Sequence, residues 1–117
     1  MTDVLCRLSD LDATGAKEIV RTEGNRRATI FVVRQNGRVY GYVNSCPHVR
    51  LPLNWTDDQF LDLSRDYIAC ANHAARFEIA TGLCVRGPCK GKSLTPVPVT
   101  VAGDDIRLTG PFPPPMD

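Results

Sequence analysis

Short apolar runs separated by polar turn residues recur along the chain, which is typical of β-strands. Residues 27–34 are rich in β-branched side chains, and residues 38–43 form a second apolar run after a short polar break. The break contains Asn36-Gly37, a dipeptide whose two residues tolerate the positive φ angles of a type I′ turn. Two such runs joined by Asn-Gly predict an antiparallel hairpin in the middle of the chain.

Shorter apolar runs predict further strands, and no segment shows a convincing helical pattern. In residues 95–102, Val97 and Val99 alternate with Pro96 and Pro98. Because proline lacks a backbone N–H, prolines on one side of a strand indicate a position near a sheet edge. The proline-rich tail 111–117 cannot continue a ladder. The remaining predicted strands are residues 4–8, 17–21, 60–63, 67–70, 76–79 and 106–108.

The fold class that these runs predict is all-β: a small antiparallel β-sandwich with an inserted, loop-rich segment of short strands over residues 44–89. A chain of 117 residues is long enough for one domain with its own core, so residues 1–117 form a single predicted domain. We find no internal repeats and no second domain.

Charge and hydropathy narrow the possible partners. The formal net charge of +1 argues against a nucleic-acid-binding surface. No apolar run approaches the roughly 18 residues of a membrane span. The first residues lack a basic stretch followed by a long apolar one, so no signal peptide is visible. We therefore expect a cytoplasmic protein that binds neither membranes nor nucleic acid.

Two short pairs of residues point to a metal site. Cys46-Pro47-His48 and Cys70-Ala71-Asn72-His73 each place a thiolate and an imidazole on one loop. The chain has two histidines, and these pairs use both. Two sulfur and two nitrogen ligands suit either a structural zinc ion or an iron–sulfur cluster with mixed ligands.

The other cysteines point to no second site. An odd total of five, with no visible secretion signal, fits reduced thiols or metal ligands better than a disulfide framework. Cys6 lies in an apolar run and is expected to be a small buried side chain. Cys84 and Cys89 are close enough in sequence for a disulfide, although a reducing compartment disfavours one.

The residues around the two pairs favour the cluster. The segment resembles the Rieske [2Fe–2S] domain, whose pattern is Cys-x-His followed by Cys-x-x-His. Asn44-Ser45 before the first pair and Pro52-Leu53 after it look like the family's first loop. Ile68-Ala69 precedes the second pair as in the family, and Gly87-Pro88 is similar to its proline loop. The resemblance extends over almost the whole chain.

This resemblance implies one [2Fe–2S] cluster per chain. Cys46 and Cys70 would bind the inner iron, and His48 and His73 the outer iron near the surface. It further implies that Pro88 belongs to a loop that covers the cluster. Leu53 would shield the cluster from water, with an ordinary core leucine as the alternative.

Two departures from the family pattern bear on the reduction potential. Leu51 and Ala71 stand where respiratory members carry an extra pair of disulfide-forming cysteines. Ala75 and Phe77 stand where high-potential members place a serine and a tyrosine that donate hydrogen bonds to the cluster. Because these donors stabilise added negative charge, their loss predicts a potential toward the low end of the roughly −150 to +300 mV Rieske range.

The functional prediction is electron transfer without catalysis. With both histidines used as ligands, none remains for a mononuclear iron or a nucleophilic pair, so we expect no enzyme activity and no small-molecule substrate. By resemblance the chain is a soluble ferredoxin that passes electrons from a flavin reductase to a terminal oxygenase. The alternatives are a Rieske subunit fixed in a reductase such as nitrite reductase, a redox-sensing module, and a structural zinc module.

Basic residues gather near the second ligand pair. Arg76, Arg86, Lys90 and Lys92 outnumber Glu78 there. Such a cluster could dock an acidic partner, or it could be an ordinary solvated face. The sequence alone does not separate these two interpretations.

Overall fold

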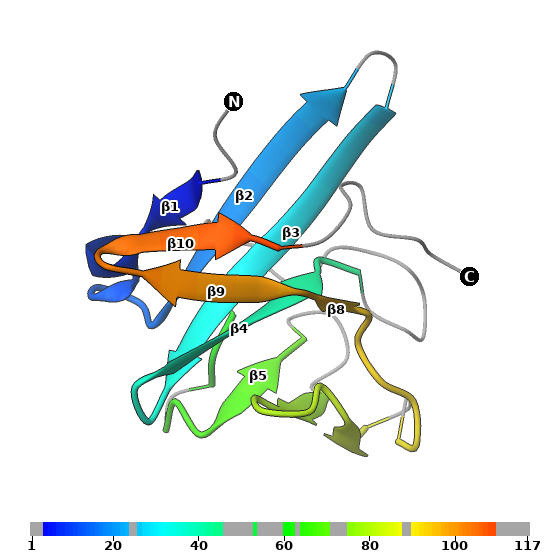
Figure 1. Ribbon diagram of the computed structural model, residues 1–117. Helices are drawn as coiled ribbons and strands as arrows, with labels where there is room; N and C mark the ends of the chain where they lie inside the picture. Colours follow the sequence, from blue (N-terminus) through cyan, green and yellow to red (C-terminus); the bar gives the residue numbers. More distant parts are fainter. Residues whose placement is uncertain are drawn as a thin grey trace.

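The structure, a computed structural model, describes residues 4–23, 26–45, 53, 60–62, 64–70, 75–87 and 90–109. Within these ranges the chain forms strands and one short 3₁₀ helix (Figure 1). The elements are β1 (Val4–Arg7), η1 (Leu8–Leu11), β2 (Ala16–Glu23), β3 (Arg26–Gln35), β4 (Arg38–Val43), β5 (Tyr67–Ala69), β6 (Arg76–Glu78), β7 (Cys84–Arg86), β8 (Pro96–Val97), β9 (Val99–Ala102) and β10 (Asp105–Leu108).

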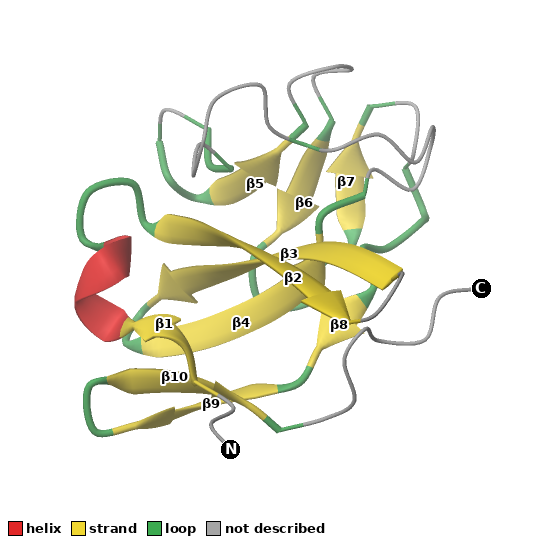
Figure 2. Ribbon diagram, turned by 90° about the horizontal axis from the view of Figure 1, so that it is seen from above, coloured by secondary structure: helices red, strands yellow, loops and turns green. Residues whose placement is uncertain are grey.

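The strands form three antiparallel sheets. A central sheet has the order β2-β3-β4-β8, a second sheet has the order β1-β10-β9, and a third has the order β5-β6-β7. Figure 2 shows the central sheet between the other two. We call β5-β6-β7 the insert sheet and the other two sheets the scaffold. The all-β fold class, with short strands inserted into a sandwich, is confirmed.

The predicted central hairpin is present. β3 and β4 pair from Ile30 opposite Val43 to Gln35 opposite Arg38. Asn36 and Gly37 connect them with φ angles of 53° and 78°. Positive φ at both turn residues is the requirement that the Asn-Gly dipeptide meets.

The central sheet buries both of its faces. Four successive residues of β3, Ile30 to Val33, are fully buried. Because side chains alternate across a strand, Phe31 and Val33 join the core beneath the insert sheet, while Ile30 and Val32 join the core against β10. Because both faces of β3 are buried, its sequence is continuously apolar. A strand with one solvated face would instead alternate apolar and polar residues.

The predicted strand 95–102 is divided in two, which corrects the expectation of one continuous strand. β8 pairs with β4 in the central sheet, and β9 pairs with β10 in the neighbouring sheet. The division falls at Pro98, which has no N–H for a ladder and whose carbonyl accepts a hydrogen bond from the Thr109 N–H at 3.0 Å. β8 is the outer strand of its sheet, so the edge position predicted from the prolines is confirmed.

Two other strand predictions differ from the structure. Of the predicted strand 60–63, the described residues 60–62 contribute one isolated bridge, Leu61 opposite Ile68. The three-residue strand β7 was not predicted, because a Cys-Val-Arg tripeptide is too short to show a period. The proline-rich tail 111–117 lies outside the described residues. Among the described elements no helix is long and apolar enough to cross a membrane.

Candidate metal centre

Cys70 is the predicted ligand that the structure places. It directly follows β5, is 1% exposed and belongs to the core between the insert sheet and the central sheet. Its N–H donates a hydrogen bond to the carbonyl of Ala75 at 3.0 Å. This bond joins the two ends of the segment that carries His73. Cys46, His48 and His73 lie outside the described residues.

The first ligand pair is flanked by a buried side-chain clamp. Asn44 is 6% exposed, and its Oδ1 accepts the N–H of Leu53 at 2.8 Å. Its Nδ2 donates to Oε2 of Glu18 at 3.0 Å, and its own N–H donates to the carbonyl of Thr29 at 2.9 Å. Asn44 therefore links both ends of the first ligand loop to β2 through its side chain and to β3 through its backbone.

Sequence reasoning missed this role of Asn44. Asn44 belongs to the loop that resembles the family, but its partners are Glu18 on β2 and the N–H of Leu53 across the ligand loop. A buried asparagine must satisfy its amide within the protein, and this requirement leaves no periodic signal in the sequence. Glu18 gave no signal either, because a charged residue on a predicted strand normally faces solvent.

A third segment packs against the base of the second ligand loop. Gly87 has a φ of +101°, and a Cβ built on it would lie 2.9 Å from the Cα of Ala75. Only a glycine permits both this backbone angle and this approach. Pro88 and Cys89 follow directly and lie outside the described residues, so the predicted covering role of Pro88 stays a prediction.

The positions predicted to lack hydrogen-bond donors are buried and apolar. Ala75 and Phe77 are both fully buried, and Phe77 lies opposite Ile68 in the ladder between β6 and β5. Leu53 is also fully buried and belongs to the same core cluster as Cys70. That position suits both interpretations of Leu53, and its shielding of a cluster stays a prediction.

Aromatic contacts anchor the insert to the scaffold. Phe60 stacks on Phe31 of β3 with ring centroids 4.2 Å apart and planes at 9°. The hydroxyl of Tyr42 on β4 donates to the carbonyl of Ile79 at 2.6 Å. Burial, followed by the neighbouring Tyr40, raises the pKa of Tyr42 to about 12, so this phenol stays protonated and donates throughout the physiological range.

The turn after β6 fits closely around the same tyrosine ring. Gly82 has a φ of +75°, and a Cβ at this position would lie 2.7 Å from Cε1 of Tyr42. The N–H of Gly82 donates to the carbonyl of Glu78 at 2.8 Å and closes the turn. Tyr42 therefore contacts the insert through its hydroxyl and through its ring.

An ion pair links the segment before β5 to β6. Oδ2 of Asp62 lies 3.5 Å from Nε of Arg76, and Oδ1 accepts the hydroxyl of Ser64 at 2.8 Å. Burial pushes the pKa of Asp62 upward, but hydrogen bonds from Ser64 and backbone amides, together with the charge of Arg76, outweigh it and lower the pKa. Asp62 is therefore ionised at neutral pH.

The described residues fit an iron–sulfur cluster. A buried cysteine lies at the end of β5, and hydrogen bonds join the bases of both ligand loops. A third loop approaches within contact distance through a glycine. The two cysteines and two histidines of the predicted ligand pairs match the ligand set of a Rieske centre.

The family comparison gives the same result. A model of the Rieske [2Fe-2S] domain matches residues 2–105, which is most of the chain. The chain therefore belongs to the Rieske [2Fe–2S] domain family, and a [2Fe–2S] cluster is its cofactor. Cys46, His48, Cys70 and His73 carry the family's ligand pattern in this sequence.

Solved structures with the same fold include several ferredoxins. A chain from the complex of reduced oxygenase and oxidized ferredoxin in carbazole 1,9a-dioxygenase is 22% identical, with a TM-score of 0.70 over 91% of this chain and 99% of that one. The Sphingomonas yanoikuyae B1 ferredoxin is 20% identical, with a TM-score of 0.67 over 95% and 100%.

The ferredoxin of carbazole 1,9a-dioxygenase from Nocardioides aromaticivorans IC177 is 23% identical, with a TM-score of 0.68 over 92% of this chain and 96% of that one. These similarities establish the fold. No curated protein sequence matches the chain.

Proposed function

We propose that this protein is a soluble one-electron carrier that takes electrons from a flavin reductase and delivers them to a terminal oxygenase. The observation that carries the proposal is the buried Cys70 at the base of the second ligand loop, against which Gly87 packs, in a chain of the Rieske family. The similarity to ferredoxin chains over nearly their full length supports the same role.

The ligand assignment extends this proposal to single residues. Cys46 and Cys70 hold the cluster as thiolates, and His48 and His73 hold it as neutral imidazoles. When bound, a [2Fe–2S] cluster takes up and releases one electron. With both histidines occupied, the chain has none left for a mononuclear iron site, which supports a carrier without enzyme activity.

The described surface favours a mobile carrier over a subunit fixed in a reductase complex. A fixed subunit needs an exposed apolar patch of several hundred Å². The large exposed apolar side chains of the described residues are dispersed over all three sheets. Val20 lies on β2, Val101 on β9, Tyr67 on β5, and Leu83 directly before β7. Glu78 separates the last two, because it pairs with Tyr67 and its N–H bonds to Leu83.

The electron partners follow from the same proposal. One structural neighbour comes from a complex of an oxygenase with a ferredoxin, which supports an oxygenase as the acceptor. A flavin reductase is the donor that the resemblance implies, and the cytoplasm is the compartment in which such a carrier would work.

Voltammetry of the purified, cluster-loaded protein tests the proposal. We expect a reversible one-electron couple at a potential nearer to −150 mV than to +300 mV. Phe77→Tyr should raise the potential, because a new hydroxyl donor worth about 1.4 kcal/mol to the reduced state corresponds to about 60 mV for one electron. Phe31→Tyr serves as the matched control and should leave the potential unchanged. A protein without a one-electron couple would contradict the proposed function.

A further inference from the structure

Positive charge is concentrated along one edge of the insert sheet. No aspartate or glutamate occurs between Glu78 and Asp104, a stretch that contains Arg86, Lys90 and Lys92. All three of these side chains are exposed. We call these three residues the basic patch.

Three arginines elsewhere on the described surface have an acidic partner, and the members of the basic patch do not. Arg34 pairs with Asp12 at 3.0 Å, Arg76 with Asp62 at 3.5 Å and Arg107 with Asp105 at 3.9 Å. Among the described residues, no carboxylate forms an ion pair with a member of the patch. Arg76, which sequence reasoning grouped with the patch, is neutralised by Asp62 and does not belong to it.

Backbone hydrogen bonds hold the patch beside the metal centre. The N–H of Lys90 donates to the carbonyl of Gly87 at 3.2 Å, and the carbonyl of Lys92 accepts the N–H of Cys84 at 2.8 Å. Gly87 in turn contacts Ala75, whose carbonyl accepts the N–H of Cys70. Arg86 and the two lysines are thus connected through two short steps to a cluster ligand.

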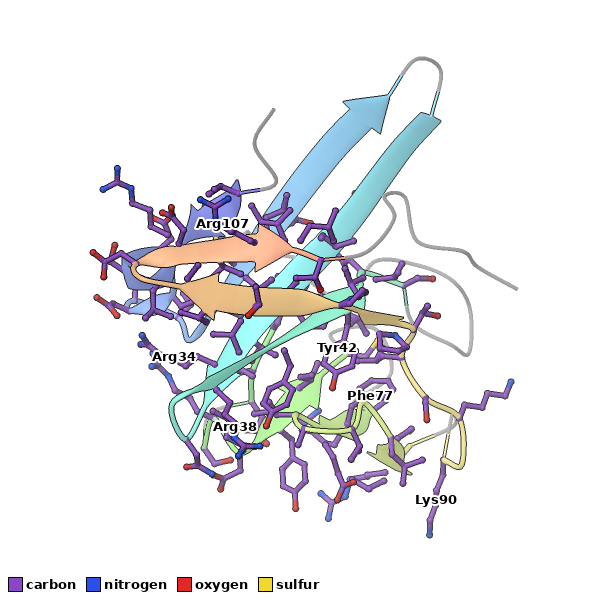
Figure 3. All side chains as sticks on the ribbon, viewed as in Figure 1. Arg34, Arg38, Tyr42, Phe77, Lys90 and Arg107 are labelled. Carbon is purple, nitrogen blue, oxygen red and sulfur yellow. The ribbon has the colours of Figure 1, made fainter. Side chains whose placement is uncertain are left out.

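The side chains of the patch point into solvent. β7 is an outer strand of the insert sheet, and Figure 3 shows Lys90 extending from the end of the molecule that the insert sheet forms. The opposite edge of this sheet differs, because Asp62 and Asp66 lie there together with Arg65. Charges of both signs therefore meet at the β5 edge, and cations stand alone at the β7 edge of the described surface.

We propose that the basic patch is the surface on which a redox partner docks, and that this partner presents a cluster of aspartate and glutamate carboxylates around its own electron-exchange site. This inference rests on the proposed carrier function and adds the chemistry of the partner. With a net charge of +1, the whole molecule exerts little long-range attraction. A local group of three cations next to the cluster can therefore determine how an acidic partner approaches.

Two small redox probes of opposite charge test the patch without the natural partner. The cluster-loaded protein is reduced, freed of reductant, and mixed in a stopped-flow instrument with hexacyanoferrate(III) or with hexaammineruthenium(III). Each probe takes one electron from one reduced protein and becomes hexacyanoferrate(II) or hexaammineruthenium(II). The return of the visible absorption gives the second-order rate constant as a function of ionic strength.

We expect the rate with the anionic probe to fall roughly tenfold when ionic strength rises from about 10 mM to about 500 mM, since salt screens the attraction to the patch. The rate with the cationic probe should rise over the same range. Lys90→Gln/Lys92→Gln should remove most of the ionic-strength dependence of the rate with each probe. Lys90→Glu/Lys92→Glu should reverse their signs.

A charge-matched control separates the effect of the patch on the rates from the effect of the overall net charge. Arg7→Gln/Arg107→Gln, on β1 and β10 of the scaffold, changes the net charge from +1 to −1 just as the lysine-to-glutamine pair does. This control should keep the salt dependence of the unaltered protein. If both pairs of substitutions change the rates equally, or if the anionic probe reacts faster at high salt, the docking proposal is overturned.

The same experiment distinguishes a failure of the proposed carrier function from a failure of the proposed docking surface. A protein that exchanges electrons with neither probe would overturn the carrier function and the docking surface together. A protein that reacts with both probes but shows no effect of the lysine substitutions would retain the carrier function and lose the basic patch as its docking surface.

Discussion

The scaffold and the insert sheet are stabilised in different ways. The scaffold contains strands of eight, ten and six residues in β2, β3 and β4, with both faces of β3 buried. The insert sheet consists of three strands of three residues each. Isolated pairs of short strands are marginal in water, so the insert needs additional support.

That support comes from a small number of contacts at defined positions. Phe60 stacks on Phe31, Tyr42 bonds to Ile79, and Asn44 ties residue 53 to the scaffold. The scaffold distributes its stability over many equivalent contacts, whereas the insert depends on single residues and on its cofactor. The comparison shows how a rigid sandwich can carry a metal centre on short strands.

Loss of a cluster ligand is expected to have the largest effect. Cys70→Ala should abolish the visible absorption and the bound iron, because one iron loses a thiolate ligand. Iron analysis and the visible spectrum of the purified variant give the result. Cys84→Ala is the matched control, since Cys84 is equally buried in the same core yet lies outside the ligand pattern. Equal iron content in the two variants would contradict the assignment of Cys70.

The aromatic anchor is expected to have the next largest effect. Phe60→Ala should lower the free energy of unfolding by about 3–5 kcal/mol, because it leaves a cavity against Phe31 and removes a stacked pair. Denaturant titration of the cluster-loaded protein measures this loss. Phe60→Leu fills most of the space and should cost clearly less. If alanine and leucine at residue 60 give the same stability, the stack does not anchor the insert.

The asparagine clamp is expected to have an intermediate effect. Asn44→Ala should lower the free energy of unfolding by about 2 kcal/mol, since the buried N–H of Leu53 loses its acceptor. Iron should also be lost faster to a chelator, because the first ligand loop is no longer closed at its base. Glu18→Gln keeps a side-chain oxygen that can accept from Asn44 and should have a smaller effect. Unchanged iron release in Asn44→Ala would show that the clamp does not position the ligands.

Removal of the tyrosine hydroxyl is expected to have the smallest effect at neutral pH. Tyr42→Phe should cost about 1 kcal/mol, because the carbonyl of Ile79 loses its donor.

Alkaline pH sharpens this test. The pKa of Tyr42 is raised from 10.0 to about 12 in the folded protein, so the unfolded chain loses this proton first. Its contribution to stability is complete below pH 10 and is lost as the pH rises from 10 to about 12. Denaturant titrations across this range should show the decline in the unaltered protein and a smaller decline in Tyr42→Phe. Parallel declines would contradict the burial of this phenol.

The scaffold was more accessible to sequence analysis than the insert. β3 and β4 have strong apolar patterns, and the dipeptide Asn36-Gly37 directly indicates the turn between them. At Pro98 the chain passes from the central sheet to the sheet that contains β9. This change could not be predicted, because the alternation of residues 95–102 continues unbroken through Pro98. β7 was missed for lack of length.

The candidate site likewise combines features that local sequence predicts with features that it does not. The four predicted ligands, and the lack of hydrogen-bond donors at positions 75 and 77, follow from local sequence and a family resemblance. The roles of Asn44 and Tyr42 depend on partners distant in the chain, and the lack of acidic partners around Lys90 depends on where each carboxylate lies in the fold. Such long-range relations carry no signal in a single sequence.

Metal and sulfide analysis of the purified protein tests the central claim most directly. A Rieske-type centre predicts a red-brown sample with two iron atoms and two acid-labile sulfides per chain, the composition of the family's cluster. A colourless protein with one zinc ion per chain would contradict it, since two cysteines and two histidines would then form a structural zinc site.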